Sequence, residues 1–197
     1  MFVFAMPGFS YTAAMKHAFD PKHLHIHAFA HAAAQLAGEE TLAHFERLLE
    51  TADGQATQTP VHFAASGELR TDSERGETTE QVWLHLSGKT TLPLVCQRCL
   101  EPVDVVVEFA RDFRFVANEA LAAAEDETSE EDVLALSKDF NLLELVEDEL
   151  LLAIPLVPKH PVCPQPLKLQ VADADFEAAD AQKPHPFAVL EQLKGKS

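Results

Sequence analysis

The stretch Pro102-Val-Asp-Val-Val-Val-Glu-Phe-Ala110 decides the fold, because apolar side chains recur at every second position from 103 to 109. Alternation with period two places one row of side chains on one face of a β-strand, where it can pack against a core. The apolar residues of two earlier segments, 61–63 and 82–86, follow the same period. We therefore expect an antiparallel sheet or a small open barrel over about residues 60–116.

Helical patterns lie on both sides of this sheet. The segment from Phe19 to Thr51 is predicted to form two short helices, or one helix broken at Gly38. Beyond the sheet, Asn141 is a suitable N-cap for a helix over about 141–153, which Pro155 ends. Helices that precede and follow a block of strands indicate the α+β class, with the later helix packed on the sheet.

Both ends of the chain are expected to be irregular. The first fourteen residues are apolar without a basic n-region, so residues 1–18 are interpreted as a disordered extension or an over-called start. From Pro155 onward the chain holds seven prolines, which predict an irregular tail over the surface. Residues 19–197 are predicted to form a single domain. No run of about 18 apolar residues occurs, so we expect no membrane partner.

The chain is acidic, with 32 acidic against 15 basic side chains and a formal net charge of −17. This balance excludes a uniformly basic protein that coats nucleic acid by neutralising phosphates. Twelve acidic residues and one lysine lie between Glu119 and Leu150, and they account for 11 of the 17 excess negative charges. We expect a mobile acidic loop at about 117–138. The acidic partner surface predicted within it consists of Glu125, Asp126, Glu127, Glu130, Glu131 and Asp132.

Three cysteines and one histidine have the spacing of a metal site. Cys96 and Cys99 lie in the expected connection between two strands, and His160 and Cys163 follow about sixty residues later. A two-residue gap lets two ligands converge on one tetrahedral ion, so this Cys3His set predicts one structural zinc that ties the tail to the sheet. Three reduced cysteines beside an unrelated histidine would fit the same residues. A redox-active cysteine pair is a further alternative, although the strand expected after it removes the usual helix N-terminus.

No pattern in the sequence points to catalysis. The chain lacks a dinucleotide-binding glycine motif, a Walker A sequence and a nucleophile elbow, and we therefore expect no enzymatic activity. Three cysteines in a chain of 197 residues are typical of a reducing compartment, which predicts a cytoplasmic protein.

Cationic side chains near the cysteines and in the tail form a second candidate contact surface, for RNA or for a protein partner. They are Arg98, Arg111, Arg114, Lys183 and His185. Scattered surface charges would account for the same residues.

Three separate blocks of the sequence resemble one known family. They are Leu94-Val-Cys-Gln-Arg-Cys-Leu-Glu-Pro102, Leu145-Val-Glu-Asp-Glu-Leu-Leu-Leu-Ala-Ile-Pro-Leu-Val-Pro158 and Gln182-Lys-Pro-His-Pro-Phe-Ala-Val-Leu190. In residues, order and spacing they are similar to the signature blocks of the bacterial YceD family, the large ribosomal RNA subunit accumulation proteins. Asp20-Pro21 also resembles the start of that family, so the similarity runs from about Phe19 to the end.

The resemblance implies a cytoplasmic, non-enzymatic factor needed for synthesis, processing or accumulation of 23S ribosomal RNA. Because a chain of net charge −17 should be repelled by bare RNA, we expect it to act through protein contacts, with a large-subunit ribosomal protein or an assembly factor as partner. The alternative is a direct RNA-binding module, in which the Cys-Gln-Arg-Cys turn and the basic tail contact 23S ribosomal RNA or its precursor.

Overall fold

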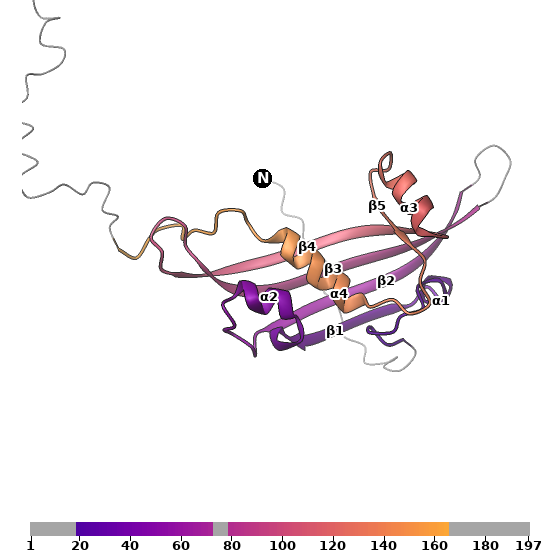
Figure 1. Cartoon of the computed structure of the whole chain (residues 1–197). Helices are drawn as coiled ribbons and strands as arrows, with labels where there is room; N and C mark the ends of the chain where they lie inside the picture. The colour runs from indigo at the N-terminus through magenta and orange to yellow at the C-terminus, as the bar shows by residue number, and fades with distance from the viewer. Residues whose placement is uncertain (1–18, 73–78, 166–197) are drawn as a thin grey trace, which may run out of the picture. The chain divides into compact units, whose positions relative to one another are not determined.

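The fold is a five-stranded sheet with one long helix and several short ones. The computed structural model describes residues 19–72 and 79–165 (Figure 1). Its strands are β1 (Gln35–Thr41), β2 (Pro60–Asp72), β3 (Thr79–Val95), β4 (Pro102–Val116) and β5 (Asp132–Ala135). Its helices are α1 (Ile26–His31), the 3-10 helix η1 (Leu42–His44), α2 (Glu46–Thr51), α3 (Glu119–Asp126) and α4 (Leu142–Ala153).

The strands lie in the order β1-β2-β3-β4-β5. The first four pair antiparallel with their sequence neighbours, whereas β5 pairs parallel to β4 over residues 113–116 only. β1 and β5 form the two edges, so the sheet is open and not closed into a barrel. The α+β class and the open sheet expected from the alternating segments are confirmed.

One face of the sheet forms the core, and α4 lies across it (Figure 1). The alternation expected for β3 is seen directly, because Val82, Leu84 and Leu86 are buried while the side chains between them are half-exposed. Buried apolar residues from all the long strands share this face. They are Val61, Phe63, Ala65, Val82, Leu84, Leu86, Leu92, Leu94, Val103, Val107, Phe113 and Phe115.

Two glycines on the core face leave room for phenylalanine rings on the neighbouring strands. Gly38 of β1 is paired with Phe63 of β2, and Gly88 of β3 is paired with Phe109 of β4. A Cβ added at Gly38 would lie 2.6 Å from Cζ of Phe63, a separation that real Cβ atoms do not show. The ring of Phe63 therefore packs directly over the glycine backbone, which a larger residue would prevent.

α4 begins and ends as the sequence predicts. The side chain of Asn141 accepts hydrogen bonds from the backbone N–H groups of Leu143 and Glu144, at 3.2 and 3.4 Å, and thereby caps the helix. The amide of Asn141 also donates to Glu144 Oε1 at 2.9 Å. The buried stripe consists of Leu142, Leu143, Val146 and Leu150, spaced so that they share one side of the helix.

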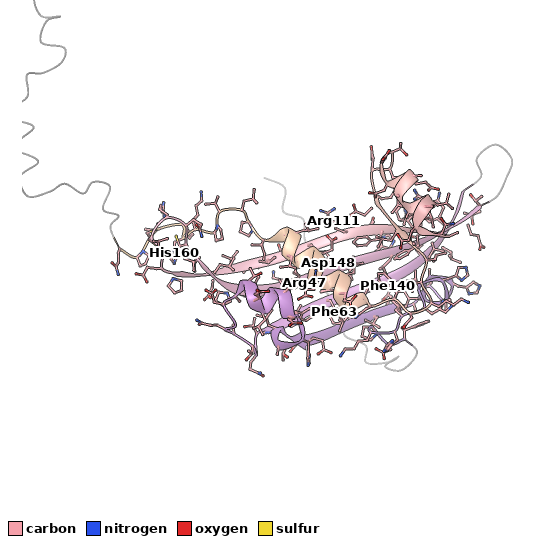
Figure 2. The ribbon with its side chains drawn as sticks, in the orientation of Figure 1. Arg47, Phe63, Arg111, Phe140, Asp148 and His160 are labelled. Carbon is pink, nitrogen blue, oxygen red and sulfur yellow. The ribbon has the colours of Figure 1, made fainter. Side chains whose placement is uncertain are left out.

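A buried carboxylate on α4 joins this helix to α2. Glu147 is 7% exposed, and its Oε1 accepts hydrogen bonds from the backbone N–H groups of Arg47 and Leu48, at 2.8 and 3.2 Å. Its Oε2 accepts two more from the guanidinium of Arg47, which also binds Asp148 (Figure 2). The carboxylate thus satisfies orphan N–H groups at the start of α2 and is itself satisfied.

Residues 35–41 differ from the expectation of N-terminal helices. They form strand β1, paired with β2 from Gln35 to Thr41. Gly38 was expected to end a helix, but it lies inside the strand under the ring of Phe63. Short helices remain on either side of the strand, in α1 and α2. Tertiary pairing with β2 therefore overrides a local pattern that looked helical.

The acidic segment also differs from the mobile loop that was expected. Its first part forms α3, which Asn118 caps by accepting a hydrogen bond from the backbone N–H of Leu121 at 3.0 Å. Its second part forms β5. Ala122 and Val133 are buried, so even this acid-rich segment contributes apolar side chains to packing.

Several expectations lie outside the described residues. These are the extension at 1–18 and the tail from 166 to 197, and with the tail the continuity of a single domain to the end of the chain. Among the helices that are described, none is long and apolar enough to cross a membrane.

Substitution of Gly38 by alanine should destabilise the sheet. The added Cβ would clash with the ring of Phe63, and overpacking of this kind typically costs about 1 to 3 kcal/mol in the free energy of unfolding. The measurement is urea denaturation of Gly38→Ala beside Ala37→Ser, a control on the exposed face of the same strand. Adding Phe63→Leu to Gly38→Ala should restore part of the loss, and an unchanged midpoint for Gly38→Ala would contradict this packing.

Candidate functional site

The Cys-Gln-Arg-Cys turn connects β3 to β4, as the sequence predicts. The backbone N–H of Cys96 donates to the carbonyl oxygen of Glu101 at 3.0 Å, and that of Leu100 donates to Cys96 at 2.8 Å. Leu100 adopts a φ of 62°, in the left-handed region, which closes the turn. These bonds fix the backbone on both sides of the two cysteines.

The segment after α4 is held against this turn. The backbone N–H of Gln97 donates a hydrogen bond to the carbonyl oxygen of Pro158 at 2.8 Å. The contact joins positions 61 residues apart, two residues before His160. It explains how the chain returns to the cysteine turn after the helix.

Four candidate ligands lie together here. One ligand atom from each of Cys96, Cys99, His160 and Cys163 lies within 4.8 Å of every other, with Cys96 buried and the other three half-buried. The four residues predicted as a Cys3His set are therefore brought together and could bind a metal.

The donor set fits zinc in number and in chemistry. Structural zinc sites use four thiolate or imidazole ligands about 2.0 to 2.3 Å from the ion, so the ligand atoms lie within about 4 Å of one another. The arrangement of the four residues is close to that requirement. Bound zinc would act as a cross-link between the turn and the chain that follows α4, and it would hold the thiols as thiolates.

Comparison with known proteins identifies the family of this chain. The YceD family, described as "Large ribosomal RNA subunit accumulation protein YceD", matches residues 84–194, which is more than half of the 197 residues. The chain belongs to the YceD family. A relative from Haemophilus influenzae (strain ATCC 51907 / DSM 11121 / KW20 / Rd), named "Large ribosomal RNA subunit accumulation protein YceD", is 40% identical over 115 residues. The alignment covers 56% of this chain and 66% of the relative. No solved structure matches the chain.

The part of the chain that matches the YceD family contains β3 from residue 84 onward, the cysteine turn, β4, α3, β5 and α4. α1, β1, η1, α2 and β2 precede the matched residues. The block at 182–190 that resembles the family is within the match but outside the described residues.

Two of the predicted contact arginines are engaged with carboxylates. Arg114 is 11% exposed and donates to Glu125 at 2.6 Å and to Glu131 at 2.8 Å. Burial opposes charging of Arg114, but these hydrogen bonds raise its pKa, and they lower the pKa of Glu131. Arg111 donates to Asp132 at 3.0 Å. RNA contact by either arginine stays a prediction, and it would require these ion pairs to open.

The six predicted partner acids consequently divide into two groups. Glu125 and Glu131 hold Arg114, Asp132 holds Arg111, and Asp126 accepts a hydrogen bond from the backbone N–H of Val133 at 3.1 Å. Glu127 and Glu130 are exposed at the surface of the same segment. Most of the acidic surface predicted from the sequence therefore stabilises the fold of α3 and β5.

The other predicted cations remain untested. Arg98 lies in the cysteine turn and makes contacts of its own. Lys183 and His185 lie outside the described residues.

The sheet face opposite α4 carries a bridge of three charged residues that the sequence did not reveal. His85 on β3 lies between two neighbouring strands, with Nε2 2.9 Å from Glu68 on β2 and Nδ1 2.6 Å from Asp112 on β4. Burial opposes protonation of His85, but its hydrogen bonds to Asp112 and Glu68 outweigh that effect and raise its pKa. Only the pairing of the strands brings these three residues together.

Zinc content should distinguish the metal centre from reduced cysteines. Purification without chelators is expected to yield about one zinc per chain by elemental analysis, and Cys96→Ser should remove most of it. His160→Ala should also lower the zinc content. His62→Ala, at a histidine on the sheet, is its control and should leave the zinc content unchanged. Less than about half an equivalent in the unaltered protein would contradict a Cys3His site.

The bridge through His85 should make stability depend on pH. Because the pKa of His85 is raised on folding, its contribution is complete below the unfolded pKa of about 6.5 and is lost as pH rises through the folded pKa. Thermal unfolding measured from pH 5.5 to 8.5 should show this loss, and His85→Gln should flatten it. The control is His27→Gln, at an exposed histidine of α1. Equal slopes for the unaltered protein and His85→Gln would contradict the role of the bridge.

Proposed function

We propose that this protein is a ribosome biogenesis factor needed for 23S ribosomal RNA to accumulate, and that it works through contacts with ribosomal or assembly proteins. Its membership of the YceD family supports the first part, since the family and the relative are named for accumulation of the large ribosomal RNA. The second part rests on the charges of the chain.

The pairing of cations with carboxylates is the observation that favours a protein partner. Binding to RNA becomes more favourable when unpaired lysines and arginines displace counterions from the phosphates. Arg111 and Arg114 already pair with Asp132, Glu125 and Glu131, and breaking those pairs would offset the gain. A basic protein meets no such cost at the exposed acids Glu127 and Glu130, and opposite potentials would speed its association.

The remaining parts of the proposal follow from the sequence. We propose a factor without enzymatic activity, because the chain has no motif for a nucleophile, a phosphate-binding loop or a dinucleotide cofactor. A cytoplasmic location agrees with its three cysteines and with a role in ribosome biogenesis. A zinc ion at the Cys3His set would have a structural role in this proposal.

Deletion of the gene tests the role in RNA accumulation. Cells without it should contain less 23S relative to 16S ribosomal RNA, and the intact gene should restore the ratio. An unchanged ratio in the deletion strain would contradict the proposal.

Binding to purified large-subunit proteins tests the mode of action. The full chain should bind them at low salt, and Glu127→Gln with Glu130→Gln should weaken binding about three- to tenfold and reduce its salt dependence. The matched control is Glu46→Gln with Glu50→Gln, which removes two exposed charges from α2. Tighter binding to 23S RNA fragments than to the proteins, weakened by Arg98→Ala, would instead support the direct RNA-binding module.

A further inference from the structure

A small cavity opens between the last turns of α4 and the middle of β4. Its volume is about 230 Å³, and its lining includes Glu108, Phe109 and Arg111 from β4 with Glu149 and Leu152 from α4. Phe109 is half-buried and Leu152 is 73% exposed, so the walls are partly apolar and open to solvent. The apolar part of the wall, at Phe109 and Leu152, suits the aliphatic stem of a long cationic side chain.

Glu149 lies in this cavity without a hydrogen bond to one of its oxygens. Its side chain is 7% exposed, and Oε2 has no hydrogen-bond partner among the described residues. The nearest cation is Nε of Arg111, which lies 3.1 Å from Oε2 but without hydrogen-bond geometry. Arg111 also donates a hydrogen bond to Asp132. A buried acceptor without a hydrogen bond destabilises the protein, so a donor that enters the cavity and bonds to Oε2 would be stabilised there.

The same part of β4 is an open sheet edge. In the part of the chain that the structure describes, β5 covers the outer side of β4 only over residues 113–116, whereas residues 102–112 pair with β3 alone. An exposed edge presents backbone N–H and C=O groups that another strand can pair with. The cavity with Glu149 lies beside this edge.

Charge indicates what kind of strand would fit. The groups that face Glu149 are Arg111 and Asp132 from the sheet and Asp148 from its own helix, with Glu108 at the cavity wall. Carboxylates outnumber cations in this set, and the protein as a whole carries a net charge of −17. The surroundings therefore favour a basic segment over an acidic one.

We propose that the open edge of β4, residues 102–112, accepts an extended segment of a basic protein partner as an added strand, with one of its lysine or arginine side chains bound to Glu149. Main-chain hydrogen bonds to the edge supply affinity, and the cavity selects the cationic side chain. This inference rests on the proposed function, because it gives the basic partner of that proposal a further contact in addition to the exposed acids Glu127 and Glu130.

A defined peptide tests the edge directly. The probe is a ten-residue peptide of alternating lysine and threonine with blocked ends, titrated into the full chain. Amide exchange in β4 at 102–112 should slow when the peptide binds, and Glu149→Gln should weaken binding about tenfold, as loss of a charge-assisted hydrogen bond predicts. The matched control is Glu50→Gln, which removes the same charge from an exposed position of α2 and should change the affinity less than about twofold.

The glutamine variant is expected to fold. Burial, with the nearby Asp132 and Asp148, raises the pKa of Glu149 despite Arg111, so these surroundings disfavour a charge and suit the neutral glutamine side chain. Leu152→Arg, at an exposed position beside the cavity, is a second variant that places a competing cation at the mouth and should weaken the peptide similarly.

Three results would overturn the inference. They are no binding of the peptide, equal weakening by Glu50→Gln and Glu149→Gln, and equal binding of a peptide with proline at alternate positions, which cannot form the added strand. The same variants are also titrated with large-subunit proteins. Binding there that Glu149→Gln leaves unchanged would overturn the edge site and leave the proposed function standing, whereas no binding by the unaltered chain would contradict the proposed protein contacts.

Discussion

The hydrogen bonds of Glu147 determine how the covering helix sits on the sheet. Its carboxylate binds the backbone and guanidinium of Arg47 and the backbone of Leu48, and so it ties α4 to the start of α2 across about one hundred residues. A helix turns about 100° per residue, so Glu149 lies on the opposite flank of the apolar stripe from Glu147. Fixing one flank against α2 therefore turns the other toward β4 and Arg111.

Much of the chain's acidity serves to stabilise the fold. Many of the carboxylates between Glu119 and Leu150 are not free surface charges, because they form ion pairs with Arg47, Arg111 and Arg114. Arg111 and Arg114, two of the cations predicted to contact RNA, are used in these pairs. Within the described residues, the proposed partner would meet exposed acids, an open strand edge and the buried carboxylate of Glu149, whose Oε2 accepts no hydrogen bond there.

Sequence reasoning found the elements whose signals are local. The alternation in β2, β3 and β4, the cap at Asn141 and the ligand spacing were all readable, and each was confirmed as strand, helix or cluster. β1 was missed because its single large apolar side chain, Leu36, gives no clear period. The roles of Glu147 and His85 could not be read, since their partners lie on other elements and only folding brings them together.

Whether the protein acts through proteins or through RNA is the central question for this member of the YceD family. The most direct measurement is affinity capture of the full chain from growing cells, with identification of bound RNA and protein before and after nuclease. If the protein acts through protein contacts, basic large-subunit or assembly proteins remain bound after the RNA is digested and are released by salt. Loss of every partner on digestion, together with cross-linking of the chain to ribosomal RNA, would contradict it.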